Sequence, residues 1–147
     1  MLKDWDLFFL CALIEYTGRE YHLSRKDVAN SFGLQGIRHI YQHAGVLHCL
    51  PIEQACDEQA AVHNIRMGTF DNISTCKYTV PDFWDIADVY EMLIQNVHSQ
   101  SQNTLEEDIL TVFNSWLIEK INNFNTALYY QTEQYLFECY KAGYILE

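Results

Sequence analysis

The sequence predicts an all-α protein, a compact bundle of six or seven helices. Apolar residues recur at steps of three and four through most of the 147 residues, which is the spacing of one helix face. Only two prolines and six glycines interrupt the chain, and they fall where helix boundaries are expected. Apolar residues make up 49% of the chain, so one core can form without a metal or disulfide.

Residues 1–66 are predicted to form an N-terminal helical subdomain. Trp5, Phe8 and Tyr16 belong to an apolar stripe on one face of the first helix. Ser24, with Asp27 three residues later, resembles a capping box and predicts the start of a second helix. The expected helices cover residues 3–21, 24–33, a segment that ends near residue 48, and 51–63.

Residues 67–81 are predicted to be an irregular strap, and residues 82–147 a C-terminal helical subdomain that shares the same core. Turn-forming residues fill the start of the strap, while Cys76–Val80 could lie extended across the core. Thr104 with Glu107 forms a second capping box. Helices are expected from residue 82 to about 97, from 104 to about 121 and from 132 to 142, where Gly143 closes the last one.

The segment 24–48 has the spacing of a helix-turn-helix. The small Ala29 would let two helices cross closely, and Gly33 would supply a left-handed turn residue between them. The same spacing also marks an ordinary tight pair of helices. A nucleic-acid contact would use side chains of types that reach phosphates and base edges, namely Arg25, Lys26, Gln35, Arg38, His39 and Gln42.

The charge of the chain is strongly acidic and unevenly distributed. The net charge is −11, which disfavours non-specific binding to nucleic acid and to anionic membranes. Residues 19–48 carry four basic and two acidic residues, against five basic and 18 acidic residues in the remainder. Nucleic-acid binding through this one segment therefore stays open, although few phosphate contacts would form.

Two surfaces are candidates for binding a partner protein. Asp85, Asp88 and Glu91 recur every third residue along the helix from residue 82 and would form an acidic face for a basic partner. An ordinary solvated helix face is the alternative. Tyr129 and Tyr130 lie in a tyrosine-rich C-terminal segment, which favours a protein contact, burial in the core, or a seam between identical subunits.

The residue pattern favours neither a metal site nor an enzyme. His48, Cys49, Cys56 and His63 are the one cluster with metal-ligand chemistry, but ligands seven residues apart on one helix cannot meet at one ion. No nucleophile–base pair, paired carboxylates or phosphate-binding glycine loop is found, so no catalytic residue and no cofactor is predicted. Five cysteines without a CxxC pair, no secretory signal and no membrane-length apolar run predict a reduced, cytoplasmic protein.

Residues 8–58 contain a characteristic set of residues, namely Phe9, Cys11, Ile14, Glu15, Tyr16, Leu23, Ser24, Val28, Phe32, Gly36, Ile40, Val46, Leu47, His48, Asp57 and Glu58. With these residues the segment resembles an uncharacterised family of small bacterial helical proteins. Members of that family are often encoded beside genes for ADP-ribosyltransferase-like toxins and are antitoxin candidates. The resemblance covers about a third of the chain and implies an interaction protein without assigned catalytic residues. Residues from Thr69 onward lie outside it.

Together these observations predict a non-enzymatic interaction or regulatory protein, antitoxin-like, that binds a partner such as a toxin through an acidic or tyrosine-rich face. The alternative is a transcriptional regulator that binds DNA through residues 24–48 and dimerises through its C-terminal half.

Overall fold

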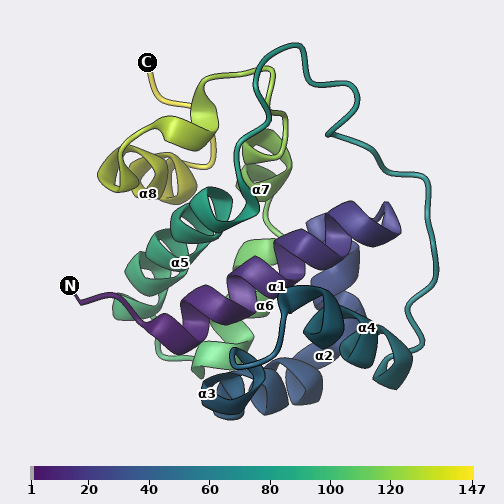
Figure 1. Ribbon diagram of the computed structural model, residues 1–147. Coiled ribbons are helices and arrows are strands. Elements are labelled where there is room, and N and C mark those ends of the chain that lie inside the picture. The colour runs from purple at the N-terminus through teal and green to yellow at the C-terminus, as the bar shows by residue number, and fades with distance from the viewer. Residues whose placement is uncertain (1) are drawn as a thin grey trace.

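The computed structural model describes residues 2–147 and confirms the all-α prediction (Figure 1). Each predicted helix is present, although two of them are divided differently from the prediction. The elements are α1 (Trp5–Tyr21), α2 (Arg25–Gln42), α3 (Ala44–Leu47), α4 (Ile52–Val62), α5 (Phe83–Ser99), α6 (Leu105–Phe113), α7 (Trp116–Ile121), the 3₁₀ helix η1 (Leu128–Tyr130) and α8 (Glu133–Ala142).

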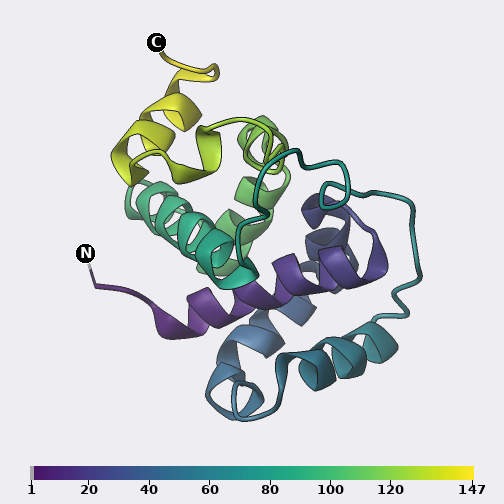
Figure 2. The same cartoon turned by 45° about the horizontal axis from the view of Figure 1, so that its top comes forward.

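Helix α1 lies in the middle of the molecule. It packs against α5 on one side and against α2, α3 and α4 on the other, and Figures 1 and 2 show it running between these two groups of helices. Leu10, Leu13 and Ile14 are fully buried, and buried residues occur around most of its circumference. Because α1 contributes to both sides, residues from 1–66 and from 82–147 meet in one hydrophobic core.

Helix α2 bends at Gly33, where the sequence predicted a turn between two helices. The backbone there has φ 68° and ψ 179°, a combination that is essentially restricted to glycine but is not the left-handed helical turn that was predicted. The second half of α2 packs closely on His63, beyond the end of α4. A Cβ atom on Gly36 would lie 2.7 Å from Cε1 of His63, so a larger residue there would displace the His63 ring.

The predicted helix from 104 to 121 is divided into α6 and α7 at Asn114 and Ser115. Both side chains bond to carbonyl groups of the preceding turn: Asn114 Nδ2 donates to Leu110 (2.8 Å), and Ser115 Oγ donates to Val112 (2.6 Å). Such local bonds compete with the helix and end it. The capping box at the start of α6 is confirmed, as is the left-handed Gly143 after α8.

The strap, residues 67–81, has no regular secondary structure and runs around the outside of the helices, as Figures 1 and 2 show. Its first part is fixed to the end of α1, where Gly68 donates to the carbonyl of Tyr21 (2.8 Å) and Phe70 to that of His22 (2.9 Å). The suggestion that Cys76–Val80 crosses the core is wrong. Tyr78 in this stretch is exposed. An irregular segment does not pair its own main-chain N–H and C=O groups, so it stays at the surface, where water can bond to them.

Candidate interaction surface

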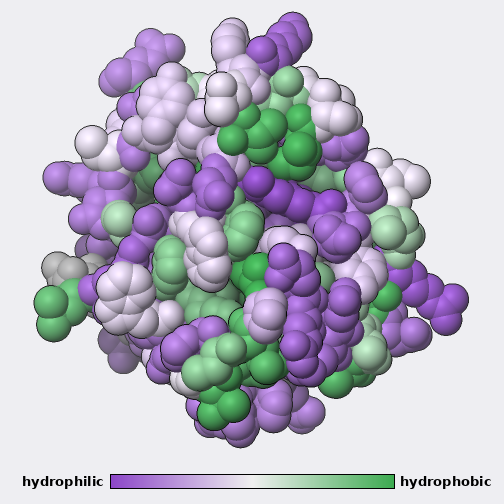
Figure 3. All heavy atoms as spheres, in the orientation of Figure 1, coloured by the Kyte–Doolittle hydropathy of each residue, from purple (hydrophilic) through white to green (hydrophobic). Residues whose placement is uncertain are grey.

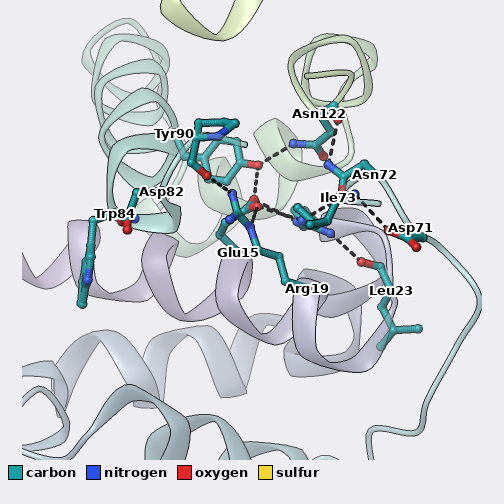
Figure 4. Close-up of polar contacts among 12 residues, drawn as sticks. Glu15, Arg19, Leu23, Asp71, Asn72, Ile73, Asp82, Trp84, Tyr90 and Asn122 are labelled. Carbon is teal, nitrogen blue, oxygen red and sulfur yellow. Dashed lines mark hydrogen bonds and ion pairs between the residues drawn. The ribbon is translucent and has the colours of Figure 1, made fainter. Parts of the chain in front are cut away.

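A buried polar network joins the two halves of the molecule beneath the surface (Figure 4). The carboxylate of Glu15 on α1 accepts two hydrogen bonds from Arg25, at 2.9 Å from Nε and 2.8 Å from Nη2. Arg19 Nε adds a third (2.7 Å) and the Tyr90 hydroxyl a fourth (2.6 Å). Asn122 Nδ2 donates in turn to the Tyr90 oxygen (2.6 Å). Both charges of the central ion pair are therefore shielded from water and fully bonded.

The network keeps Glu15 ionised. Burial alone would raise the pKa of Glu15, but the guanidinium of Arg25, with Arg19 and the Tyr90 hydroxyl, lowers it from 4.5 to about 2. Burial and the nearby Glu15 carboxylate raise the pKa of Tyr90 well above its ordinary value, so its hydroxyl stays protonated and donates. Two further groups complete the arrangement. Asn72 of the strap accepts from Arg25 (3.2 Å), and Gly18 leaves room for the Arg25 side chain.

This network is structural rather than a binding site. Arg25 is 1% exposed, and each of its three guanidinium nitrogens already donates, to Glu15, Asn72 or the carbonyl of Leu23. The suggestion that Arg25 contacts nucleic acid is thus corrected, because its charge lies in the core. Figure 4 shows Arg19 and Tyr90 reaching Glu15 from the same side of α1 as Asn122.

The chain segment before α1 lies along the acidic face of α5. The Gln95 side chain donates to the carbonyl of Leu2 (2.9 Å), and the main-chain N–H of Asp4 donates to Glu91 (3.3 Å). The Tyr41 hydroxyl of α2 donates to the carboxylate of Asp4 (2.7 Å) and fixes that residue from the other side. Glu91 is therefore 1% exposed, and its prediction as part of an accessible acidic face is wrong.

Lys3 occupies a small site built from two aromatic rings and one carboxylate. Its ammonium nitrogen lies 4.4 Å from the centre of the Phe8 ring and 5.1 Å from that of the Trp5 ring. It also forms an ion pair with Asp88 of α5. Both distances are within the range of a cation–π contact. We call Trp5, Phe8 and Asp88 the lysine seat.

The rings of the lysine seat continue into a row of aromatic side chains across α1 and the start of α5. Phe8 stacks on Trp84 with centroids 5.5 Å apart, Trp84 contacts Phe83 (4.9 Å), and Phe83 contacts Tyr16 (5.3 Å). Trp5 meets the other edge of Phe8 at 5.7 Å. We call these five residues the aromatic row. Figure 4 shows Trp84 extending from the first turn of α5 beside α1.

The aromatic row remains accessible at both tryptophans. Trp5 is 68% exposed and Trp84 is 39% exposed. Asp6, Asp82 and Asp85 are exposed on the same helix starts, and within residues 2–147 none of the three takes part in an ion pair. On the face shown in Figure 3, strongly hydrophobic residues form small separate areas in a mostly hydrophilic surface.

Sequence reasoning missed this surface because it assigned Trp5, Phe8 and Tyr16 to a single apolar helix face. A usable signal was present: in both helices an aspartate N-cap is followed within two residues by tryptophan, as Asp4–Trp5 and Asp82–Phe83–Trp84. Side chains in the first turn of a helix point back toward the N-terminal end of that helix, where they lie close to solvent.

The other predicted partner-binding residues are divided between two places. Asp85 is exposed beside Trp84. Tyr129 packs edge-on against Phe124 (5.6 Å) and Tyr130 (5.0 Å), and Tyr130 is exposed. Both tyrosines line a shallow pocket of about 210 Å³ that also includes Asp88. The structure thus brings Asp88 next to the tyrosine pair, although the sequence treated them as separate surfaces.

The remaining nucleic-acid candidates are exposed but weakly basic as a group. Gln35, His39 and Gln42 lie on the surface of the second half of α2. The Arg38 guanidinium is paired with Glu106 at the start of α6 (Nε to Oε1, 2.7 Å), so its charge is largely neutralised. Lys26 is exposed at the opposite end of α2. These side chains therefore form no concentrated positive patch.

The cluster considered for metal binding is dispersed. Cys56 is buried and accepts a hydrogen bond from the Thr17 hydroxyl (3.3 Å), His63 packs on Phe32 (5.2 Å), and Cys49 is exposed. In the part of the chain that the structure describes, no three His, Cys, Asp or Glu side chains are grouped as metal ligands would be. Among residues 2–147, no helix combines the length and hydrophobicity needed to cross a lipid bilayer.

Comparison of the chain with models of protein families, with curated proteins and with solved structures gave no match.

Proposed function

We propose that this protein is a non-catalytic interaction protein that binds a basic region of a partner protein through the aromatic row and the carboxylates beside it. The observation that carries the proposal is the exposure of Trp5 and Trp84 in one continuous set of rings. Tryptophan is enriched among the residues that dominate binding energy in protein interfaces. Phe8 contacts both Trp5 and Trp84, so the exposed rings belong to one contiguous patch, and contiguous exposed apolar patches mark interaction sites.

The charge of the surface specifies the kind of partner. Asp6, Asp82 and Asp85 are exposed at the starts of the two helices that carry Trp5 and Trp84, and the whole chain carries a net charge of −11. The negative electrostatic potential of this surface attracts a basic partner surface and increases its association rate, most strongly at low salt. Arginine and lysine side chains also interact favourably with indole faces. The resemblance of residues 8–58 to antitoxin candidates makes a toxin the first partner to test.

The proposal is tested by capturing partners from the lysate of the native host with tagged wild-type protein and with the Trp5→Ala/Trp84→Ala variant. Tyr78→Ala serves as the matched control, because Tyr78 is an equally exposed aromatic residue on the strap. We expect one stoichiometric protein with wild type and Tyr78→Ala, and its loss with the double variant. Circular dichroism verifies that all three proteins are folded. Equal capture by the double variant, or capture of no protein by wild type, would overturn the proposal.

A DNA-binding regulator is the second candidate, favoured by the exposed Gln35, His39 and Gln42 on one half of α2. The same capture with and without nuclease separates the two functions. If nucleic acid is recovered with wild type and with Trp5→Ala/Trp84→Ala but not with Arg38→Glu, the DNA-binding function is favoured over the protein-binding one. Insensitivity to nuclease and to Arg38→Glu would exclude it.

A further inference from the structure

We propose that the lysine seat is a binding site for a lysine or arginine side chain of the partner, and that Lys3 is an internal competitor that occupies it in the free protein. This inference rests on the proposed function and specifies its chemistry. It makes residues 2 and 3 an autoinhibitory segment that a basic partner segment replaces.

The seat has the components that recognise a cationic side chain. Trp5 and Phe8 present ring faces to the ammonium group of Lys3, and Asp88 supplies the opposite charge. The three residues come from two helices that are fixed independently of Lys3, since α1 and α5 pack closely and are joined through Glu15 and Tyr90. The seat therefore persists when Lys3 leaves.

The occupying segment is held weakly. Leu2 is 93% exposed, so it adds almost no buried apolar area. Apart from the Lys3 side-chain contacts, the described residues 2 and 3 take part in one hydrogen bond, from Gln95 to the carbonyl of Leu2. Asp4 marks the limit of the replaceable part, because its side chain caps α1 through the N–H of Leu7 (3.0 Å). Surface ion pairs and exposed cation–π contacts contribute little individually, so another cation can replace this one.

The geometry also indicates how the partner segment binds. Gln95 offers a side-chain donor to a main-chain carbonyl, one residue before the position where the basic side chain enters the seat. A partner segment in an extended conformation can make both contacts at once, as residues 2 and 3 do. The exposed Asp85 lies three residues before Asp88 on α5, and it extends the negative surface for a second basic residue.

The test uses a capped Gly-Lys-Gly peptide as the probe, and a Gly-norleucine-Gly peptide as the uncharged control. Binding is followed by NMR from the indole N–H signals of Trp5 and Trp84, with the half-buried Trp116 as an internal reference. Wild type, Lys3→Ala and Lys26→Ala are compared, because Lys26 is an exposed lysine remote from the seat and its loss changes the net charge equally. Lys3→Ala/Asp88→Asn removes the carboxylate of the seat.

We expect Lys3→Ala to bind the lysine peptide about three- to tenfold more tightly than wild type, which corresponds to a seat that Lys3 fills most of the time. Lys26→Ala should behave as wild type, the norleucine peptide should not bind, and Asp88→Asn should abolish the gain. Equal affinity in Lys3→Ala and wild type would overturn the proposal. Concentration-dependent dimerisation of wild type that Lys3→Ala abolishes would also overturn it, since a second copy would then be the occupant.

The two proposals fail separately. If the partner is lost with Trp5→Ala/Trp84→Ala while Lys3→Ala leaves peptide binding unchanged, the interaction surface stands and the competitor role falls. If Lys3→Ala strengthens peptide binding while Trp5→Ala/Trp84→Ala captures the partner as well as wild type does, the lysine seat is supported and the proposed function is wrong.

Discussion

Replacing Glu15 with glutamine removes the negative charge that faces Arg25 in the core, while the size of the side chain hardly changes. The guanidinium of Arg25 has almost no access to water and would keep its charge without a counterion. Removing one partner of a buried ion pair costs about 3–5 kcal/mol. A domain of this size is stable by about 5–15 kcal/mol, so Glu15→Gln should lose a large share of the total. The corresponding drop in melting temperature is about 10–15 °C.

Urea denaturation at pH 7, followed by circular dichroism, measures this loss as a change in the free energy of unfolding. Glu20→Gln is the matched control, because Glu20 is exposed near the end of the same helix and makes the same change of charge. It should alter stability by less than about 0.5 kcal/mol. A loss below about 1 kcal/mol in Glu15→Gln would show that Arg25 is not left as an unpaired buried charge, because water or another group would then be bonded to it.

The pH dependence provides an independent check on the same ion pair. Because the folded protein lowers the pKa of Glu15 from 4.5 to about 2, the carboxylate contributes stability that is complete above pH 4.5. That contribution, about 3 kcal/mol, is lost as the pH falls toward 2. Glu15→Gln should therefore show a smaller decline in stability over this acidic range than wild type. A decline as steep as that of wild type would assign the acid sensitivity to other groups.

Three further changes test other parts of the structure. Gly33→Ala should destabilise the protein by about 1–3 kcal/mol in urea denaturation, because alanine is strained at the backbone angles of Gly33. Gly45→Ala in α3 should be neutral or stabilising, because a Cβ atom there would have no neighbouring atom within 4 Å. Thr104→Ala should lower the melting temperature by an amount equivalent to about 1 kcal/mol, since it removes the capping box of α6. Asn72→Ala breaks the bonds from the strap to Arg25 and to the carbonyl of Asn122, so limited proteolysis should cut the strap faster, and an unchanged rate would show that these bonds do not hold it.

Helix positions were determined locally and could be predicted from the sequence. The apolar spacing that defines α1 and α5, the capping residues Ser24 and Thr104, and the terminal Gly143 act within one or two turns of the chain. The break at Asn114 was missed although its cause is also local, because a periodic apolar stripe continued through it. The net charge and the number and spacing of the cysteines can likewise be read from the sequence alone.

Which side chains are buried was decided by the tertiary structure. Arg25 looked like a surface cation until Glu15, ten residues earlier, and Asn72, 47 residues later, were placed around it. Tyr90 reaches the same carboxylate from 75 residues away. Glu91 is buried beneath the segment before α1, where the N–H of Asp4 donates to it, whereas Trp5 remains 68% exposed at the start of α1. The free energy of burying a charge depends on its contacts, and contacts between distant segments exist only after the helices have packed.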